Sequence, residues 1–310
     1  MRRRVRLAIW AVALYAAASL AGGVFLSVVA LHPDRRPITP RARAAAQSVA
    51  AQFGGRVEEV STTAADRTVL RAWFIAPATR NGSTVMLFHG VSDCRTGMTG
   101  YADLFLSRGY AVLLPDSRAH GESGGAITTY GLRERDDIRR WKDWLADRER
   151  PACTYALGES MGAGLVLQSL AAEPGFCAVV AESGWVGLRE VAFDRVAGHT
   201  PTSPFIARTL LRGPIEVGLL LARLRHGMDF SQASAADAVA WTRVPVLLIH
   251  GLRDTNIYPR HSREIAARNP SHVTLWEVPG AAHGGAMTAA PQEFERRVLG
   301  HFAAHPTPTR

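Results

Sequence analysis

A serine flanked by glycines marks the segment of the chain best suited to covalent chemistry. Residues 158–162 are Gly-Glu-Ser-Met-Gly, a G-x-S-x-G pattern that follows an apolar run over Cys153–Leu157. Glycines at both ends allow a strand and a helix to meet in a sharp, strained turn that exposes the serine. The N-terminus of the following helix would point at the serine, where negative charge develops during acyl transfer. The pattern therefore predicts Ser160 as a nucleophile.

A serine hydroxyl needs a histidine to take its proton and a carboxylate to orient and stabilise that histidine. Asp254 follows the predicted strand Val244–Ile249, and His283 follows the predicted strand Val273–Val278. The chain order Ser, Asp, His is the order used where a G-x-S-x-G turn carries the nucleophile. We predict a triad of Ser160, Asp254 and His283.

Other side chains compete for the roles of acid and base. Among eleven histidines, His89 and His250 lie in His-Gly pairs at strand ends, which favours structural hydrogen bonding, whereas His261 and His272 are predicted at the surface.

Asp116 and Asp229 are rivals of Asp254, but Asp116 precedes the nucleophile and belongs to another motif. No histidines, cysteines or acids have metal-ligand spacing, so the sequence predicts neither a metal nor another cofactor.

An acyl-transfer site also needs two donors for the tetrahedral oxygen. One is predicted to be the backbone N–H of Met161, next after the nucleophile. The loop after Thr84–Phe88 contains Gly90, which allows the backbone to turn the amide of Val91 toward the site. We predict Met161 and Val91 as the oxyanion hole.

Short apolar runs alternate with helical patterns along the chain, which predicts a mostly parallel sheet covered by helices on both sides. One such helix is Leu132–Ala146, with apolar residues at helical spacing. The predicted strands are Val69–Ile75, Thr84–Phe88, Tyr110–Leu114, Cys153–Leu157, Cys177–Ala181, Val244–Ile249 and Val273–Val278.

The alternation breaks between Ser183 and Arg243, where about 60 residues separate two strands. Helix-like runs over Gly187–Ala197 and Pro214–Arg225 predict an inserted helical cap, whose apolar residues either pack on the core or line an acyl pocket. The expected organisation is a membrane segment (1–31), a linker (32–54), a hydrolase core in two parts (55–184 and 244–310) and the cap (185–243) between them.

Over residues 55–303 the chain resembles the alpha/beta-hydrolase superfamily, in particular its branch of membrane-linked serine hydrolases related to serine aminopeptidases and lysophospholipases. The resemblance rests on His89-Gly90, the segment Asp116–Gly125, the serine turn, the loop that ends at Asp254 and the loop that ends at His283. It implies the alpha/beta-hydrolase fold and leaves the substrate open.

The segment Asp116–Gly125 is similar to the family's Asp-x-Arg-Gly-His-Gly-x-Ser loop, with Ala119 in place of the usual glycine. The resemblance implies that Asp116, Arg118 and His120 support the site structurally and do not take part in catalysis.

An uncharged run of 25 residues, Leu7–Leu31, follows an arginine-rich N-terminus. At a rise of about 1.5 Å per residue it can cross a bilayer core of roughly 30 Å. Cleaved signals usually have shorter apolar regions, which favours a retained single-pass anchor, although small residues ending at Ala21 and Ala30 also fit cleavage. Arginines flank both ends, but long domains translocate regardless of flanking charge, so we expect the catalytic domain outside the cytoplasm, in the periplasm or on the outer face.

The formal net charge of +9 does not indicate a nucleic-acid partner, because all but one of the 36 basic residues are scattered arginines. Three cysteines cannot form a disulfide scaffold. Cys153 and Cys177 begin consecutive strands, and they are either bridged or two buried thiols, whereas Cys94 is expected to be free.

The triad predicts an enzyme that hydrolyses carboxylic esters through an acyl-enzyme on Ser160. The apolar cap and the anchor extend the hypothesis to lipid or other apolar acyl esters. A thioesterase, an amidase or an aminopeptidase would use the same chemistry. An alternative of another class is a catalytically silent, membrane-tethered binding module.

Overall fold

The computed structural model describes residues 2–172, 175–198 and 204–307. Within these ranges eight strands form one sheet in the order β1-β2-β4-β3-β5-β6-β7-β8. The strands from β3 to β8 are parallel, whereas β1 and β2 are antiparallel to their neighbours. The predicted, mostly parallel sheet is therefore confirmed. The strands are β1 Val57–Thr63, β2 Val69–Ile75, β3 Ser83–Phe88, β4 Ala111–Pro115, β5 Cys153–Glu159, β6 Val179–Glu182, β7 Val246–Gly251 and β8 Val273–Val278.

Helices cover both faces of the sheet, because alternate side chains of each buried strand point to opposite faces. One face carries α4, α5, α9 and α10, with Trp141 and Leu165 in its core, and the other carries α2, α3, α11 and α12, with Phe105 and Phe302 in its core. The helices are α1 Arg2–Leu31, α2 Pro40–Gln52, α3 Thr99–Leu106, α4 Glu134–Arg148, α5 Met161–Ser169, α6 Leu188–Gly198, α7 Pro204–Leu210, α8 Arg212–His226, α9 Ala235–Ala240, α10 Arg260–Arg268, α11 Ala286–Ala289 and α12 Pro291–Ala303, with short 3-10 turns at Arg95–Met98, Leu170–Ala172 and Phe230–Gln232.

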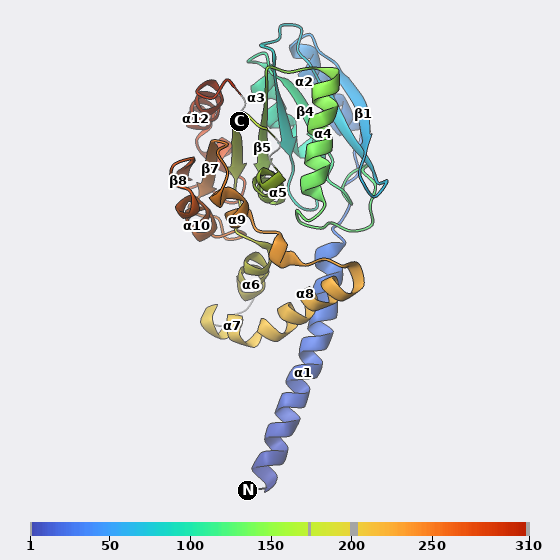
Figure 1. The fold of residues 1–310 in the computed structure, drawn as a ribbon, viewed down its shortest axis with the longest axis vertical. Coiled ribbons are helices and arrows are strands. Elements are labelled where there is room, and N and C mark those ends of the chain that lie inside the picture. The colour runs from blue at the N-terminus through green and yellow to red at the C-terminus, as the bar shows by residue number, and fades with distance from the viewer. Residues whose placement is uncertain (1, 173–174, 199–203, 308–310) are drawn as a thin grey trace.

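The helices α6 to α9 occupy the segment between β6 and β7, where the sequence predicts a helical insertion. Two of them, α6 and α8, coincide with the predicted helical runs. The other two, α7 and α9, were not predicted. Figure 1 shows α7 and α8 standing away from the sheet, with α8 beside the upper half of α1.

The helix α1 projects from the rest of the molecule, and its N-terminal end lies far from the sheet (Figure 1). In the described part of the chain it is the one helix that is long and apolar enough to cross a membrane, judged by length and composition.

A disulfide joins Cys153, at the start of β5, to Cys177, just before β6, with a Cα–Cα distance of 5.8 Å. The backbone N–H of Cys177 also donates to the carbonyl of Thr154 at 3.0 Å. Of the two alternatives that the sequence left open, the structure has the bridge. Cys94 is free and buried.

Candidate active site

Ser160 occupies the turn between β5 and α5, with φ 56° and ψ −113°. Such a positive φ is strained for a residue other than glycine and is typical of an exposed nucleophile. A Cβ on Gly158 would lie 2.3 Å from the carbonyl oxygen of Gly162, and one on Gly162 would lie 2.2 Å from that of Phe88. The two glycines are therefore required for the close packing that fixes the serine.

The three predicted triad residues meet at the carboxyl ends of β5, β7 and β8. His283 Nε2 lies 2.8 Å from Ser160 Oγ, and His283 Nδ1 lies 2.8 Å from Asp254 Oδ2. The other carboxylate oxygen of Asp254 accepts the backbone N–H groups of Asn256 and Ile257, each at 2.9 Å. These bonds hold the carboxylate behind the imidazole, so that the order of contacts is Asp254, His283, Ser160.

Asp254 is buried, which by itself raises the pKa of its carboxyl group. Hydrogen bonds from His250 and His283, together with the backbone bond from Ile257, outweigh that effect and hold the pKa below its usual value. The carboxylate is therefore ionised at neutral pH and can stabilise a positive charge on His283.

The loop after β3 lies directly against the nucleophile. A Cβ on Gly90 would be 3.4 Å from the Cβ of Ser160, and Val91, Ser160 and Met161 line the same cavity. Met161 is the first residue of α5, where backbone N–H groups have no partner within the helix. Both residues predicted to supply oxyanion donors thus lie beside Ser160 at the same cavity.

Two competing histidines are occupied by structural bonds. His250 contacts Ser262 Oγ at 2.6 Å and the carbonyl of Ile257 at 2.8 Å. The ring of His89 accepts the backbone N–H of Ser117 at 3.1 Å, and burial lowers its pKa.

The prediction that His261 lies at the surface is wrong. It is fully buried, accepts the N–H of Val186 at 3.3 Å and contacts Asp194 at 3.1 Å. His261 therefore ties α10 to the start of the cap, whereas His272 is exposed as predicted.

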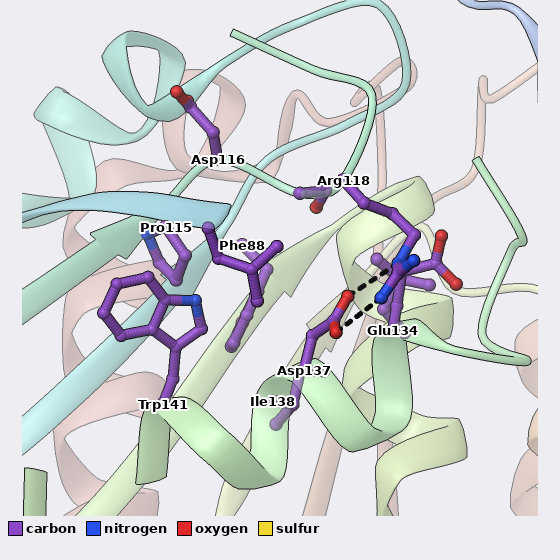
Figure 2. Close-up of a pocket in the computed structure, with 11 residues that line it drawn as sticks. Phe88, Pro115, Asp116, Arg118, Glu134, Asp137, Ile138 and Trp141 are labelled. Atoms are coloured by element: carbon purple, nitrogen blue, oxygen red, sulfur yellow. Dashed lines mark hydrogen bonds and ion pairs between the residues drawn. The ribbon is translucent and has the colours of Figure 1, made fainter. Parts of the chain in front are cut away.

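The segment from Asp116 to Gly125 supports the loops of the site. Figure 2 shows Arg118 facing Asp137 of α4, and the two side chains form paired bonds of 2.7 and 2.8 Å. Asp116 accepts the backbone N–H groups of Arg95 and Glu122 at 2.7 and 2.8 Å. The void beside this loop is about 10 Å³, too small for more than one water molecule.

Two neighbours of these residues complete the loop. His120 is buried and contacts the carbonyl of Arg118 at 2.9 Å. Ala119, which replaces the usual glycine, has φ 61°, a conformation that is strained for alanine.

Two carboxyl groups beside the triad, buried Glu182 and half-buried Glu159, were not predicted from the sequence. The hydroxyl of Tyr101 lies 2.9 Å from Glu182 and 3.1 Å from Glu159, and Glu182 also accepts the backbone N–H of Ala286 at 2.8 Å. One hydroxyl has one proton to donate, and burial raises the pKa of both carboxyl groups, which favours a protonated carboxyl group in this cluster. Because Ala286 lies three residues after His283, this network supports the loop that carries His283. Its signal in the sequence was a glutamate that ends an apolar strand.

Burial raises the pKa of Glu182 to about 7. A carboxyl group that is neutral in the folded state stabilises the fold fully below its unfolded pKa of 4.5, and this contribution is lost as pH rises toward 7. Between these pH values the wild type should lose about 3 kcal/mol of its free energy of unfolding. We expect Glu182→Gln, which mimics the neutral form, not to show this loss. The melting temperature of the wild type should therefore fall relative to that of the variant between pH 4.5 and 7.

The matched control is Glu277→Gln on β8, whose side chain is half-exposed and paired with Arg263. Its melting temperature should follow the wild type across the same pH range. Equal pH profiles for wild type and Glu182→Gln would contradict a neutral Glu182.

A cavity of about 330 Å³ opens next to Ser160. Trp185, Tyr130 and Phe230 border it, and residues of α1, α6 and α8 form much of the rest of its wall. In the described part of the chain, no group of histidine, cysteine, aspartate and glutamate side chains could hold a metal ion.

Solved structures with the same architecture support the assignment of the fold. The esterase Pf2001 of Pyrococcus furiosus superposes with a TM-score of 0.69 at 24% identity, over 89% of this chain and 99% of that one. An acylaminoacyl peptidase superposes with a TM-score of 0.61 at 16% identity, over 83% of this chain and 42% of that one. The fold and the site define an alpha/beta-fold serine hydrolase.

Residues 35–204, more than half of the chain, match the family model described as X-Pro dipeptidyl-peptidase (S15 family). The chain belongs to this family within the alpha/beta-hydrolase superfamily. It is also similar to the uncharacterized protein YqkD of Bacillus subtilis, with 28% identity over 74% of this chain and 73% of that protein. The uncharacterized protein YfhR of Escherichia coli K12 is 26% identical over 73% of each chain.

Proposed function

We propose that this serine hydrolase cleaves carboxylic esters with apolar acyl groups, through an acyl-enzyme on Ser160. The observation that carries the proposal is the hydrogen-bonded series from Asp254 through His283 to Ser160, beside an apolar cavity. Esterases among the structures of the same fold agree with this chemistry.

In the proposed reaction, Ser160 Oγ attacks the ester carbonyl while His283 Nε2 accepts the hydroxyl proton. Asp254 orients the imidazole and stabilises its positive charge, and the backbone N–H groups of Met161 and Val91 bind the oxyanion. The imidazolium then protonates the departing alcohol. Water, deprotonated by His283, attacks the acyl-enzyme and releases the carboxylic acid and free Ser160.

The cavity lining favours an apolar acyl group. Aliphatic and aromatic side chains predominate, and of the described residues that line the cavity, Arg195 is the one that carries a charge. An acyl chain buried there would gain about 0.8 kcal/mol for each CH₂ group removed from water.

The family description makes a dipeptidyl-peptidase the second candidate. Such an enzyme must bind the positively charged amino terminus of its substrate, for which a carboxylate is the natural partner. The described residues that line the cavity include no aspartate or glutamate. The lining therefore favours an ester over a free dipeptide amine.

We also propose that α1 is a retained membrane anchor with the catalytic domain outside the cytoplasm. Its length and composition fit a membrane span. The disulfide between Cys153 and Cys177 supports an oxidising compartment for the domain.

Two chromogenic substrates test the proposed ester specificity. We expect the full-length protein in detergent micelles to hydrolyse p-nitrophenyl octanoate, and to cleave Gly-Pro p-nitroanilide at least 100-fold more slowly, measured as kcat/KM. The Ser160→Ala variant supplies, for both substrates, the background rate that does not depend on the nucleophile. Preferential cleavage of the anilide would support the dipeptidyl-peptidase, and a protein that turns over neither substrate and resists fluorophosphonate labelling would support the silent binding module.

A further inference from the structure

The helix α1 is packed against the cap helix α8 with almost no space between their backbones. A Cβ on Gly23 would lie 2.5 Å from Val217 and 2.9 Å from the backbone nitrogen of Gly218, and one on Gly218 would lie 3.2 Å from the carbonyl oxygen of Gly23. Small residues of this kind let helices approach closely within lipid. The pair is visible in Figure 1, where α8 lies alongside the upper half of α1.

The C-terminal end of α1 is also fixed to the hydrolase core. The hydroxyl of Tyr130 donates to the carbonyl of Ala30 at 2.7 Å, and the backbone N–H of Thr128 donates to that of Leu31 at 3.0 Å. Tyr130 itself borders the cavity beside Ser160. The last turn of α1 is thus held in a defined position relative to the nucleophile.

That position makes α1 part of the cavity. Leu26, Ser27 and Ala30 of α1 line it together with Leu219 of α8, and the same cavity reaches Ser160. We propose that the last two turns of α1 form one wall of an acyl-binding pocket, and that the substrates are esters whose acyl chains enter this pocket from the bilayer. This inference rests on the proposed esterase activity.

The length of α1 indicates the depth at which the pocket lies. Contact with α8 begins near Tyr15, whose hydroxyl accepts the backbone N–H of Gly213 at 3.1 Å. On the N-terminal side of that contact, the apolar residues 7–14 are only about 12 Å long, whereas a bilayer core is roughly 30 Å thick. The helix can therefore cross the membrane only if α8 and the adjoining part of the cap enter the near leaflet.

The surface of the cap fits that depth. Phe205 is 81% exposed, Leu224 is 72% exposed and Leu220 is 52% exposed. Arg223 and Arg225 lie in the last turn of α8, where long basic side chains reach the headgroups while their stems remain in apolar surroundings. Acyl chains in this leaflet would lie at the level of the pocket. A lipid could therefore bind without first being extracted from the bilayer into water.

Larger side chains on the pocket face of α1 test the inference. In the full-length protein in detergent micelles, Ser27→Phe and Ala30→Phe should each lower the ratio of kcat/KM for p-nitrophenyl octanoate to that for p-nitrophenyl acetate by at least tenfold, because the longer chain needs the space that the ring fills. The matched control is Val28→Phe, since Val28 is 47% exposed and does not line the cavity. Its ratio should equal that of the wild type.

The outcomes separate this inference from the proposed function. If the wild type hydrolyses both esters through Ser160 and the ratio stays within twofold of the wild type in Ser27→Phe and Ala30→Phe, α1 is not a wall of the acyl pocket. If Val28→Phe lowers the ratio as much as Ser27→Phe and Ala30→Phe do, the inference that α1 forms a wall of the acyl pocket is also overturned. If the wild type hydrolyses neither ester, the proposed function fails and the inference fails with it.

Discussion

Replacing Ser160 with alanine is expected to lower kcat for p-nitrophenyl octanoate by about 10⁵- to 10⁶-fold, because triad residues act as a unit and loss of the nucleophile removes the acyl-enzyme route. The variant should keep only the small rate enhancement over water that substrate binding and oxyanion stabilisation provide. Stopped assays on purified, folded protein measure the difference, and labelling by a fluorophosphonate should disappear in the variant.

The matched control is Ser107→Ala just after α3, where the serine hydroxyl donates to the carbonyl of Leu104, within its own helix and away from the triad. Its activity and labelling should match the wild type. Residual activity of Ser160→Ala above one-tenth of the wild-type rate would rule out Ser160 as the nucleophile.

Replacing Asp254 with asparagine is expected to lower kcat by about 10⁴-fold. Asparagine preserves the shape of the side chain but presents an amide that no longer fixes His283 in the tautomer with a free Nε2. The carboxylate that stabilises the imidazolium is also lost. The effect should appear in kcat with an unchanged melting temperature if the backbone bonds from Asn256 and Ile257 persist on the amide oxygen.

The control for Asp254→Asn is Asp229→Asn, because Asp229 is the other downstream aspartate considered for the role of Asp254. Asp229 caps a short turn of the cap and bonds Ser231, and asparagine is an equally good capping residue. Its rate should stay within twofold of the wild type. A loss of less than tenfold in Asp254→Asn would assign the orienting role to another group.

Two strands that carry the triad, β5 and β7, were predictable because they are buried on both faces and form short, mostly apolar runs bounded by polar loops. The third, β8, lies at the edge of the sheet with only Val273 and Val278 buried, and it was predictable from its β-branched and aromatic residues. The strand β1, Val57–Thr63, was not predicted. It lies at the edge of the sheet and its side chains are half-buried or exposed, so its pairing with β2 leaves no continuous apolar run.

The burial of His261 and the contact of Glu182 and Glu159 with the same Tyr101 hydroxyl were not predictable for a different reason. Both depend on contacts between segments far apart in the chain: Asp194 lies 67 residues from His261, and Tyr101 lies 81 residues from Glu182. No local sequence pattern around His261 or Glu182 indicates that its side chain is buried against a distant partner.

The sequence by itself determined the nucleophile turn, the order of Ser160, Asp254 and His283, and the place of each after a strand, because these features are local and the parallel sheet brings the strand ends together. It also marked the apolar N-terminal helix and the helical insertion as separate segments. Only the tertiary structure decided that these two segments pack against each other and that Leu26, Ser27 and Ala30 border the cavity beside Ser160. An apolar helix has the same composition whether it faces lipid or a pocket, so its place in the site depends on the helices packed against it.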